Sequence, residues 1–118
     1  MNLAKLIREN VKEQQKIYWL LTGIILLVAL ALRVTGLGFS YSNDELSALV
    51  RVRFDSFSEL VDKGFYVDGH PGGIQVFLFY WVKLFGMSEW AVRLPFVIGG
   101  VLAVFFAIRL FSRWFSPT

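Results

Sequence analysis

One apolar run, residues 17–37, limits more than any other feature what this chain can fold into. Until Arg33 it contains only apolar residues, glycine and Thr22. About twenty helical residues, at about 1.5 Å each, cross the hydrocarbon layer of a bilayer, which is about 30 Å thick. An arginine near the end of such a helix can extend its side chain to the interface. We therefore expect a transmembrane helix over residues 17–37 and an all-α integral membrane protein.

The composition also indicates a membrane environment. Hydrophobic residues make up 56% of the 118 residues, with 12 Phe and 4 Trp, which is too apolar for a small soluble domain. The chain has no cysteine, so a disulfide framework and a thiolate metal site are excluded. The net charge of +3 is modest and its basic residues are dispersed, so we expect no nucleic-acid partner.

The residues before the apolar run are charged. Four cations precede the run, among apolar residues at helical spacing: Lys5, Arg8, Lys12 and Lys16. We expect residues 1–16 to form an amphipathic segment on the membrane surface, retained and not cleaved as a signal peptide. The positive-inside bias then places the N-terminus in the cytoplasm and the loop at residues 38–71 outside.

The loop at residues 38–71 is polar and acidic and lies between two apolar halves of the chain. Two Ser-x-x-Glu pairs in the loop fit the capping box of a helix start, Ser42 with Glu45 and Ser56 with Glu59. We expect two short interfacial helices, one over about residues 44–54 and one that stops at Gly64.

Two further apolar runs, residues 72–86 and 89–111, follow the loop. We expect both to span the membrane, although the first is short and contains Lys83, so it needs protein neighbours. The prediction is about three transmembrane helices, with a tail at residues 112–118 outside; a re-entrant second segment is the alternative. Small residues recur every fourth position in the last run, a spacing that lets another helix approach: Gly99, Ala103 and Ala107.

The candidate catalytic residues are two adjacent acids, Asp44 and Glu45, at the start of the first interfacial helix. The helix dipole favours acids in a first turn, and Glu45 is also explained as a cap, so a structural role is the simpler interpretation. Adjacent acids at a membrane interface also suit a general base or a group that binds a substrate hydroxyl.

The candidate substrate-binding residues are basic. His70, the only histidine, precedes Pro71 at a helix start, where it is a loop residue or helps to hold a lipid phosphate. One histidine is a weak metal signal, so we assign no metal ligands. Three loop cations would neutralise a phosphate or meet lipid headgroups: Arg51, Arg53 and Lys63. Arg93 is expected to anchor the third span at the cytoplasmic surface.

In their order, these pieces resemble the N-terminal part of the GT-C glycosyltransferases that use polyprenyl-phosphate sugars. The resemblance is to the bacterial relatives of protein O-mannosyltransferases and of the lipid A aminoarabinose transferase. The matching stretches are residues 33–38 (RVTGLG), 43–45 (NDE), 69–71 (GHP) and 84–95 (LFGMSEWAVRLP). The chain departs from the family pattern at Gly72, where a second proline is usual, and at Phe96, where a small residue is common.

The resemblance implies that Asp44 is the acid at the catalytic centre and activates or orients the acceptor hydroxyl. Glu45 would support Asp44 or bind the acceptor, and His70 would lie near the lipid phosphate. The implied donor is a polyprenyl-phosphate-linked sugar at a bacterial inner membrane, and a divalent metal cofactor stays open. Family members have many more spans, so we expect a fragment or one piece of a split enzyme, inactive without its remaining transmembrane helices.

Two functions from other classes are alternatives. A small non-enzymatic membrane protein would use the Gly99, Ala103 and Ala107 positions to pack against a partner helix. An interfacial lipid-binding module would hold anionic headgroups through Arg51 and its neighbouring loop cations, and its binding to membranes would be sensitive to salt.

Overall fold

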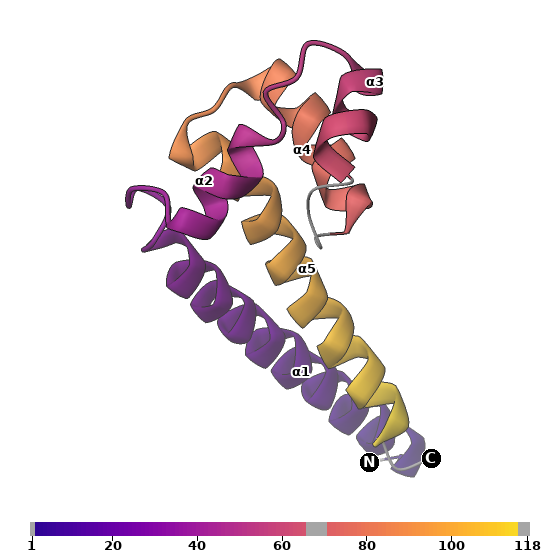
Figure 1. Ribbon diagram of the computed structural model, residues 1–118. Coiled ribbons are helices and arrows are strands. Elements are labelled where there is room, and N and C mark those ends of the chain that lie inside the picture. The colour runs from indigo at the N-terminus through magenta and orange to yellow at the C-terminus, as the bar shows by residue number, and fades with distance from the viewer. Residues whose placement is uncertain (1, 66–70, 116–118) are drawn as a thin grey trace. The chain divides into compact units, whose positions relative to one another are not determined.

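The computed structural model describes residues 2–65 and 71–115, and within these ranges the chain forms helices and no strand. The prediction of an all-α fold is thereby confirmed for the described part of the chain. In chain order the elements are α1 (Leu3–Val34), α2 (Asn43–Val50), α3 (Phe57–Glu59), the π-helical segment η1 (Leu60–Phe65), α4 (Gly72–Phe85) and α5 (Glu89–Trp114) (Figure 1).

The chain divides into two compact units. The second unit is the continuous segment Gly36–Phe96, and the first unit combines Met1–Thr35 with Val97–Thr118. Helix α5 therefore contributes its first residues to the second unit and the rest to the first unit.

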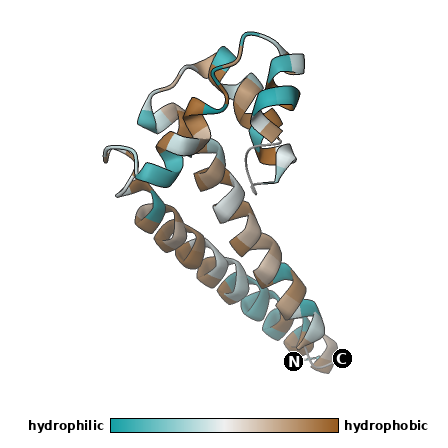
Figure 2. Ribbon diagram, viewed as in Figure 1, coloured by the Kyte–Doolittle hydropathy of each residue, from teal (hydrophilic) through white to brown (hydrophobic). Residues whose placement is uncertain are grey.

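Helix α1 runs without a break, so the predicted amphipathic segment and the first apolar run form one helix of 32 residues. The side chain of Asn2 caps its start by accepting from the Ala4 amide (3.3 Å). The helix ends at Val34, three residues before the predicted boundary, and Thr35 Oγ1 donates to the Leu32 carbonyl (2.9 Å). Figure 2 shows the hydrophilic residues of α1 gathered in its first part.

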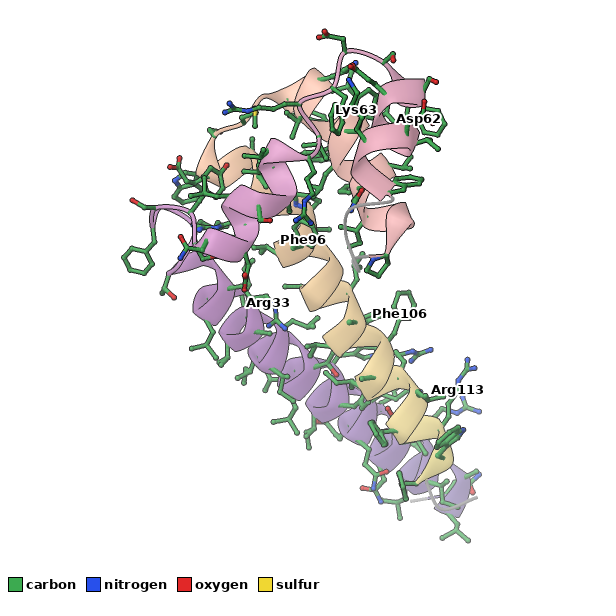
Figure 3. The ribbon with its side chains drawn as sticks, in the orientation of Figure 1. Arg33, Asp62, Lys63, Phe96, Phe106 and Arg113 are labelled. Atoms are coloured by element: carbon green, nitrogen blue, oxygen red, sulfur yellow. The ribbon has the colours of Figure 1, made fainter. Side chains whose placement is uncertain are left out.

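In the first unit, α1 packs antiparallel to the later part of α5. The Tyr18 hydroxyl lies 3.0 Å from Ser112 Oγ near one end of the pair. Near the other end the Arg33 side chain covers Gly100 so closely that a Cβ there would overlap it, and Figure 3 shows Arg33 projecting toward α5. The α5 glycine in contact with α1 is therefore Gly100, which the Arg33 side chain covers, whereas Gly99 of the small-residue spacing has no atom within 4 Å of its Cβ position.

Two helices, α1 and α5, are long and apolar enough to cross a membrane. Large apolar side chains on both are exposed, for example Leu27 (67%) and Phe106 (64%), as lipid-facing residues are. Helix α4 has 14 residues and rises only about 21 Å, less than the hydrocarbon layer. The prediction of three spans is not confirmed.

The second unit has a hydrophobic core of its own, to which α4 contributes. Its buried side chains come from α2, α4, α5 and the segments between α2 and α4: Leu49, Val52, Leu60, Leu78, Phe79 and Val92. Near the end of α4, Lys83 Nζ donates to the Asp55 carbonyl (3.1 Å). One face of α4, with Leu78 and Phe79, therefore serves a protein core, whereas its opposite face keeps exposed apolar side chains such as Leu84 (76%).

The short helices in the loop differ from their predicted bounds. Helix α2 ends at Val50, before the predicted residue 54, and the next buried side chain, Val52, packs into the core from a turn. The second short helix begins after Ser56, whose side chain accepts from the Glu59 amide (3.2 Å). The Glu59 carboxylate accepts from the Asp55 amide (3.3 Å), so the capping box there is incomplete.

Gly64 was expected to end the second short helix, but the helical segment continues through it to Phe65. Among the described glycines only Gly86, which ends α4, has a positive φ (86°). A Cβ at Gly64 would lie 3.1 Å from Leu60 Cδ1 and 3.4 Å from Gln75 Oε1. Phe54 Cε2 would lie at 3.3 Å, so the absence of a side chain relieves crowding against Leu60 and Phe54, whereas the contact with Gln75 of α4 is of ordinary length.

Candidate active site

The two adjacent acids lie in the first turn of α2, as predicted. The Ser42 hydroxyl accepts from the Glu45 amide (3.3 Å), and Glu45 Oε2 accepts from the Ser42 amide (2.8 Å). This reciprocal pair is the complete capping box expected from the sequence. Asp44 is exposed and Glu45 is half-buried, so the two carboxylates have different surroundings although they are neighbours in the chain.

Glu45 forms a bidentate ion pair with Arg93. Arg93 Nε donates to Oε1 and Nη2 donates to Oε2, each at 2.8 Å. The Arg93 side chain is only 16% exposed and that of Glu45 is 36% exposed. Two parallel charge-assisted hydrogen bonds fix the orientation of both groups, so this pair joins the start of α2 to the start of α5.

The Arg93 guanidinium also binds the chain that enters α2. Its terminal nitrogens donate to four backbone carbonyls, those of Gly36 (3.0 Å), Leu37 (3.1 Å), Phe39 (2.6 Å) and Ser40 (3.3 Å). These carbonyls follow α1 and are not used by a helix. Arg93 was expected to anchor a span at the cytoplasmic surface; instead it organises the segment before α2, because packing supplies it with acceptors.

We call Arg93, Glu45 and these four backbone carbonyls the clamp, and Tyr41 packs against it. The Tyr41 ring lies 5.4 Å from the Arg93 guanidinium carbon, and its hydroxyl donates to the Met87 carbonyl (2.8 Å). Burial, reinforced by the charge of Glu89, raises the pKa of the Tyr41 hydroxyl. Tyr41 therefore stays protonated and acts as a hydrogen-bond donor.

The clamp decides the charge of Glu45. The hydrogen bonds from Arg93, and then from the Ser42 amide, lower the pKa of Glu45 from 4.5 to about 2. A general base works best with a pKa near the working pH, so Glu45 is a poor proton acceptor at neutral pH. Asp44 makes no hydrogen bond or ion pair with residues 2–65 or 71–115, and its carboxylate remains available to a substrate.

An apolar pocket opens beside the two acids. Its volume is about 350 Å³, within the usual range for small-molecule sites. The lining comes from α2, α4 and α5: Asp44, Glu45, Ala48, Leu49, Ile74, Leu78, Val92, Arg93 and Phe96. Because Glu45 and Arg93 neutralise each other, Asp44 is the uncompensated charge among these residues.

The predicted substrate-binding cations do not gather at this pocket. Arg51, Arg53 and Lys63 are absent from its lining. Lys63 Nζ pairs with Glu59 Oε1 (2.7 Å) on the surface, which raises the pKa of Lys63 and lowers that of Glu59. His70 lies outside the described residues. The structure therefore brings Asp44 and Glu45 together with a pocket, but not the three loop cations.

The described residues include no cluster of three or more His, Cys, Asp or Glu side chains that could hold a metal ion.

Sequence reasoning missed Arg93 and Tyr41 as parts of the site. A signal for Arg93 was present, because it lies within the first turns of a helix between Val92 and Leu94. An arginine between two apolar residues in a packed helix needs a partner. Its partner, Glu45, lies 48 residues away, so no local pattern identifies it.

Comparisons with protein-family models, with curated proteins and with solved structures found no match for this chain. The resemblance in four short stretches therefore stays a prediction, and the site is the main support for a function.

Proposed function

We propose that this chain is the N-terminal, acid-bearing part of a membrane glycosyltransferase. The enzyme transfers a sugar from a polyprenyl-phosphate donor to an acceptor hydroxyl. The observation that carries the proposal is the exposed carboxylate of Asp44 beside an apolar pocket of about 350 Å³, one residue from the clamped Glu45. An available base next to an apolar cavity suits a reaction between a hydroxyl and a lipid-linked substrate.

In the proposed reaction, the acceptor oxygen attacks the anomeric carbon of the sugar while its proton passes to the Asp44 carboxylate. The bond from the anomeric carbon to the phosphate oxygen breaks, and the phosphate leaves with the electron pair. A phosphate is a stable anion at neutral pH, so the site needs cationic stabilisation more than a general acid. Glu45 acts as a positioning residue, because its pairing with Arg93 holds the first turn of α2.

The cation for the leaving phosphate comes from outside the described pocket in this proposal. Arg93 is the one cation in the pocket lining, and Glu45 already neutralises it. His70, the loop cations or the remaining transmembrane helices of a larger enzyme would provide the positive charge. The chain alone would therefore be inactive, and its partners would be these helices, membrane lipid and the lipid-linked donor.

We further propose a bacterial inner-membrane topology with two spans, α1 and α5. The antiparallel arrangement of these helices in the first unit supports this topology. Tyr18, early in α1, hydrogen-bonds Ser112, late in α5, whereas Arg33, late in α1, contacts Gly100, which lies earlier in α5. Both termini then lie on the cytoplasmic side, where the positive-inside bias favours the four cations of the N-terminal segment and also Arg109. Residues 36–88, with Asp44, lie outside.

The test is Asp44→Asn in the complete enzyme that carries this chain. Transfer of sugar from a polyprenyl-phosphate donor is expected to fall at least about 100-fold, because the general base is lost. Asp62→Asn is the matched control, since Asp62 is an exposed acid on η1 that does not line the pocket. Circular dichroism should show both variants folded.

Wild-type turnover by a folded Asp44→Asn enzyme would refute the assignment of Asp44. Equal losses in Asp44→Asn and Asp62→Asn would show that general charge, and not the pocket, matters for transfer.

A second candidate function is a non-enzymatic membrane protein that packs against a partner helix through α5. The observation in its favour is Gly99, which has no atom within 4 Å of the place where a Cβ would lie, so that a partner could approach there. This function predicts a membrane complex that survives Asp44→Asn but is lost in Gly99→Leu. Gly23→Leu on α1, where space is also open, is the control.

A further inference from the structure

A second groove lies on the later part of α5 in the first unit. Its volume is about 350 Å³, and it is lined by two cations and three apolar side chains: Phe105, Phe106, Arg109, Leu110 and Arg113. Arg109 and Arg113 are four residues apart and therefore share a face of the helix. Figure 3 shows Phe106 and Arg113 projecting from the same side of α5. The groove thus combines an apolar part with a doubly positive part.

Aromatic side chains indicate the depth of this groove in a membrane. Tyr18 and Trp19 lie in α1 opposite the end of α5, since the Tyr18 hydroxyl meets Ser112 (3.0 Å) and the Arg109 guanidinium lies 5.6 Å from the Trp19 ring centre. Tyrosine and tryptophan concentrate at the bilayer interface. In the proposed topology this places Arg109 at headgroup depth, and Phe105, one helical turn earlier, about 6 Å deeper among the acyl chains.

The charge at this end of the first unit favours an anion. The antiparallel register brings the N-terminal part of α1 to the same end as the two arginines, and its cations are Lys5, Arg8, Lys12 and Lys16. Of the two acids there, Glu13 is already paired with Lys16 (2.7 Å). No acid is among the groove's lining residues. A negatively charged ligand is consequently attracted and meets no like charge.

We propose that the groove binds an anionic membrane phospholipid. Arg109 and Arg113 hold the headgroup phosphate through charge-assisted hydrogen bonds, for which the guanidinium fork is well shaped. Phe105, Phe106 and Leu110 contact the adjoining part of the acyl chains. The site is independent of sugar transfer, since none of these residues belongs to the Asp44 pocket.

The experiment measures lipid binding to the purified full chain in detergent by native mass spectrometry. The probes are phosphatidylglycerol, phosphatidylcholine and glycerol 3-phosphate. The wild-type chain is expected to retain phosphatidylglycerol in preference to the other two, because only this lipid has both a net negative headgroup and acyl chains. In Arg109→Gln/Arg113→Gln the affinity for phosphatidylglycerol is expected to fall at least about tenfold.

Two variants keep the result interpretable. Arg53→Gln/Lys63→Gln removes the same charge from exposed positions in the second unit, outside the groove, and is expected to bind within about twofold of wild type. Arg109→Lys/Arg113→Lys keeps the charge and should retain more binding than the glutamine variant. Equal losses in both glutamine variants, equal binding of phosphatidylcholine by the wild type, or saturation by glycerol 3-phosphate alone would each overturn the proposal.

Discussion

The two units of this protein bury apolar surface in opposite ways. In the first unit most large apolar side chains of α1 and α5 are exposed. The 18-residue stretch that is apolar enough to cross a membrane is only 11% buried in α1 and only 6% buried in α5. In the second unit, Leu60 and Phe79 are enclosed by protein. The exposed apolar surface of the first unit suits a membrane, whereas the second unit has a buried core of its own.

The difference explains why the candidate chemistry lies in the second unit. A site requires side chains held in one geometry, and packing from several directions provides this restraint. In the second unit Arg93 is held by Glu45 and by four carbonyls, and the pocket is walled by three helices. The first unit instead exposes two apolar helices of membrane-spanning length, which suit anchoring.

The largest expected effect comes from exchanging one phenylalanine in each unit for alanine. Phe79→Ala removes a side chain that is 2% exposed, and the cavity should destabilise the second unit by about 3–5 kcal/mol. Phe111→Ala removes one that is 55% exposed and should cost much less in detergent, where the site is already solvated. Hydrogen exchange of peptides from α2 and α4 measures the difference. Equal protection in the two variants would contradict a separate core in the second unit.

An intermediate effect is expected at the clamp. Arg93→Met leaves the half-buried Glu45 and several carbonyls without their donor, and should destabilise the second unit by about 2–3 kcal/mol. Arg53→Met, at an exposed cation of the same unit, should cost under about 0.5 kcal/mol. Limited proteolysis of residues 36–50 reports the result. If both variants resist protease as well as the wild type, Arg93 does not organise this segment.

The smallest effect is the pH dependence that Glu45 contributes. Its pKa is about 2 in the folded chain and 4.5 in the absence of its partners. The stabilisation is therefore complete above about pH 5 and is lost as the pH falls from 4.5 toward 2. After allowance for solvent screening it amounts to about 1–2 kcal/mol. Denaturant unfolding of the wild type and of Glu45→Gln should show a stability difference that shrinks in this interval; a constant difference from pH 6 to 2 would be the contrary result.

Local features of the fold were predictable because they depend on neighbouring residues. The capping box between Ser42 and Glu45 is present as predicted, and Gly86 ends α4 with the positive φ that favours glycine. The apolar lengths of α1 and α5 are also a property of continuous segments. The boundary at Gly64 was wrong because this buried glycine has no positive φ and instead packs closely against Leu60 and Phe54, so the helical segment continues through it.

The amino-acid sequence by itself determined the all-α class, the two long apolar helices and the position of the adjacent acids in a helix's first turn. These follow from helical periodicity, capping within one turn, and hydropathy over about twenty residues. Only the tertiary structure decided that Glu45 is neutralised by Arg93 while Asp44 remains open, and that α4 contributes to a core. The physical reason is that two charged groups 48 residues apart form their hydrogen bonds only where packing brings them together, and these bonds must offset the cost of desolvating both groups. No local pattern of residues encodes this.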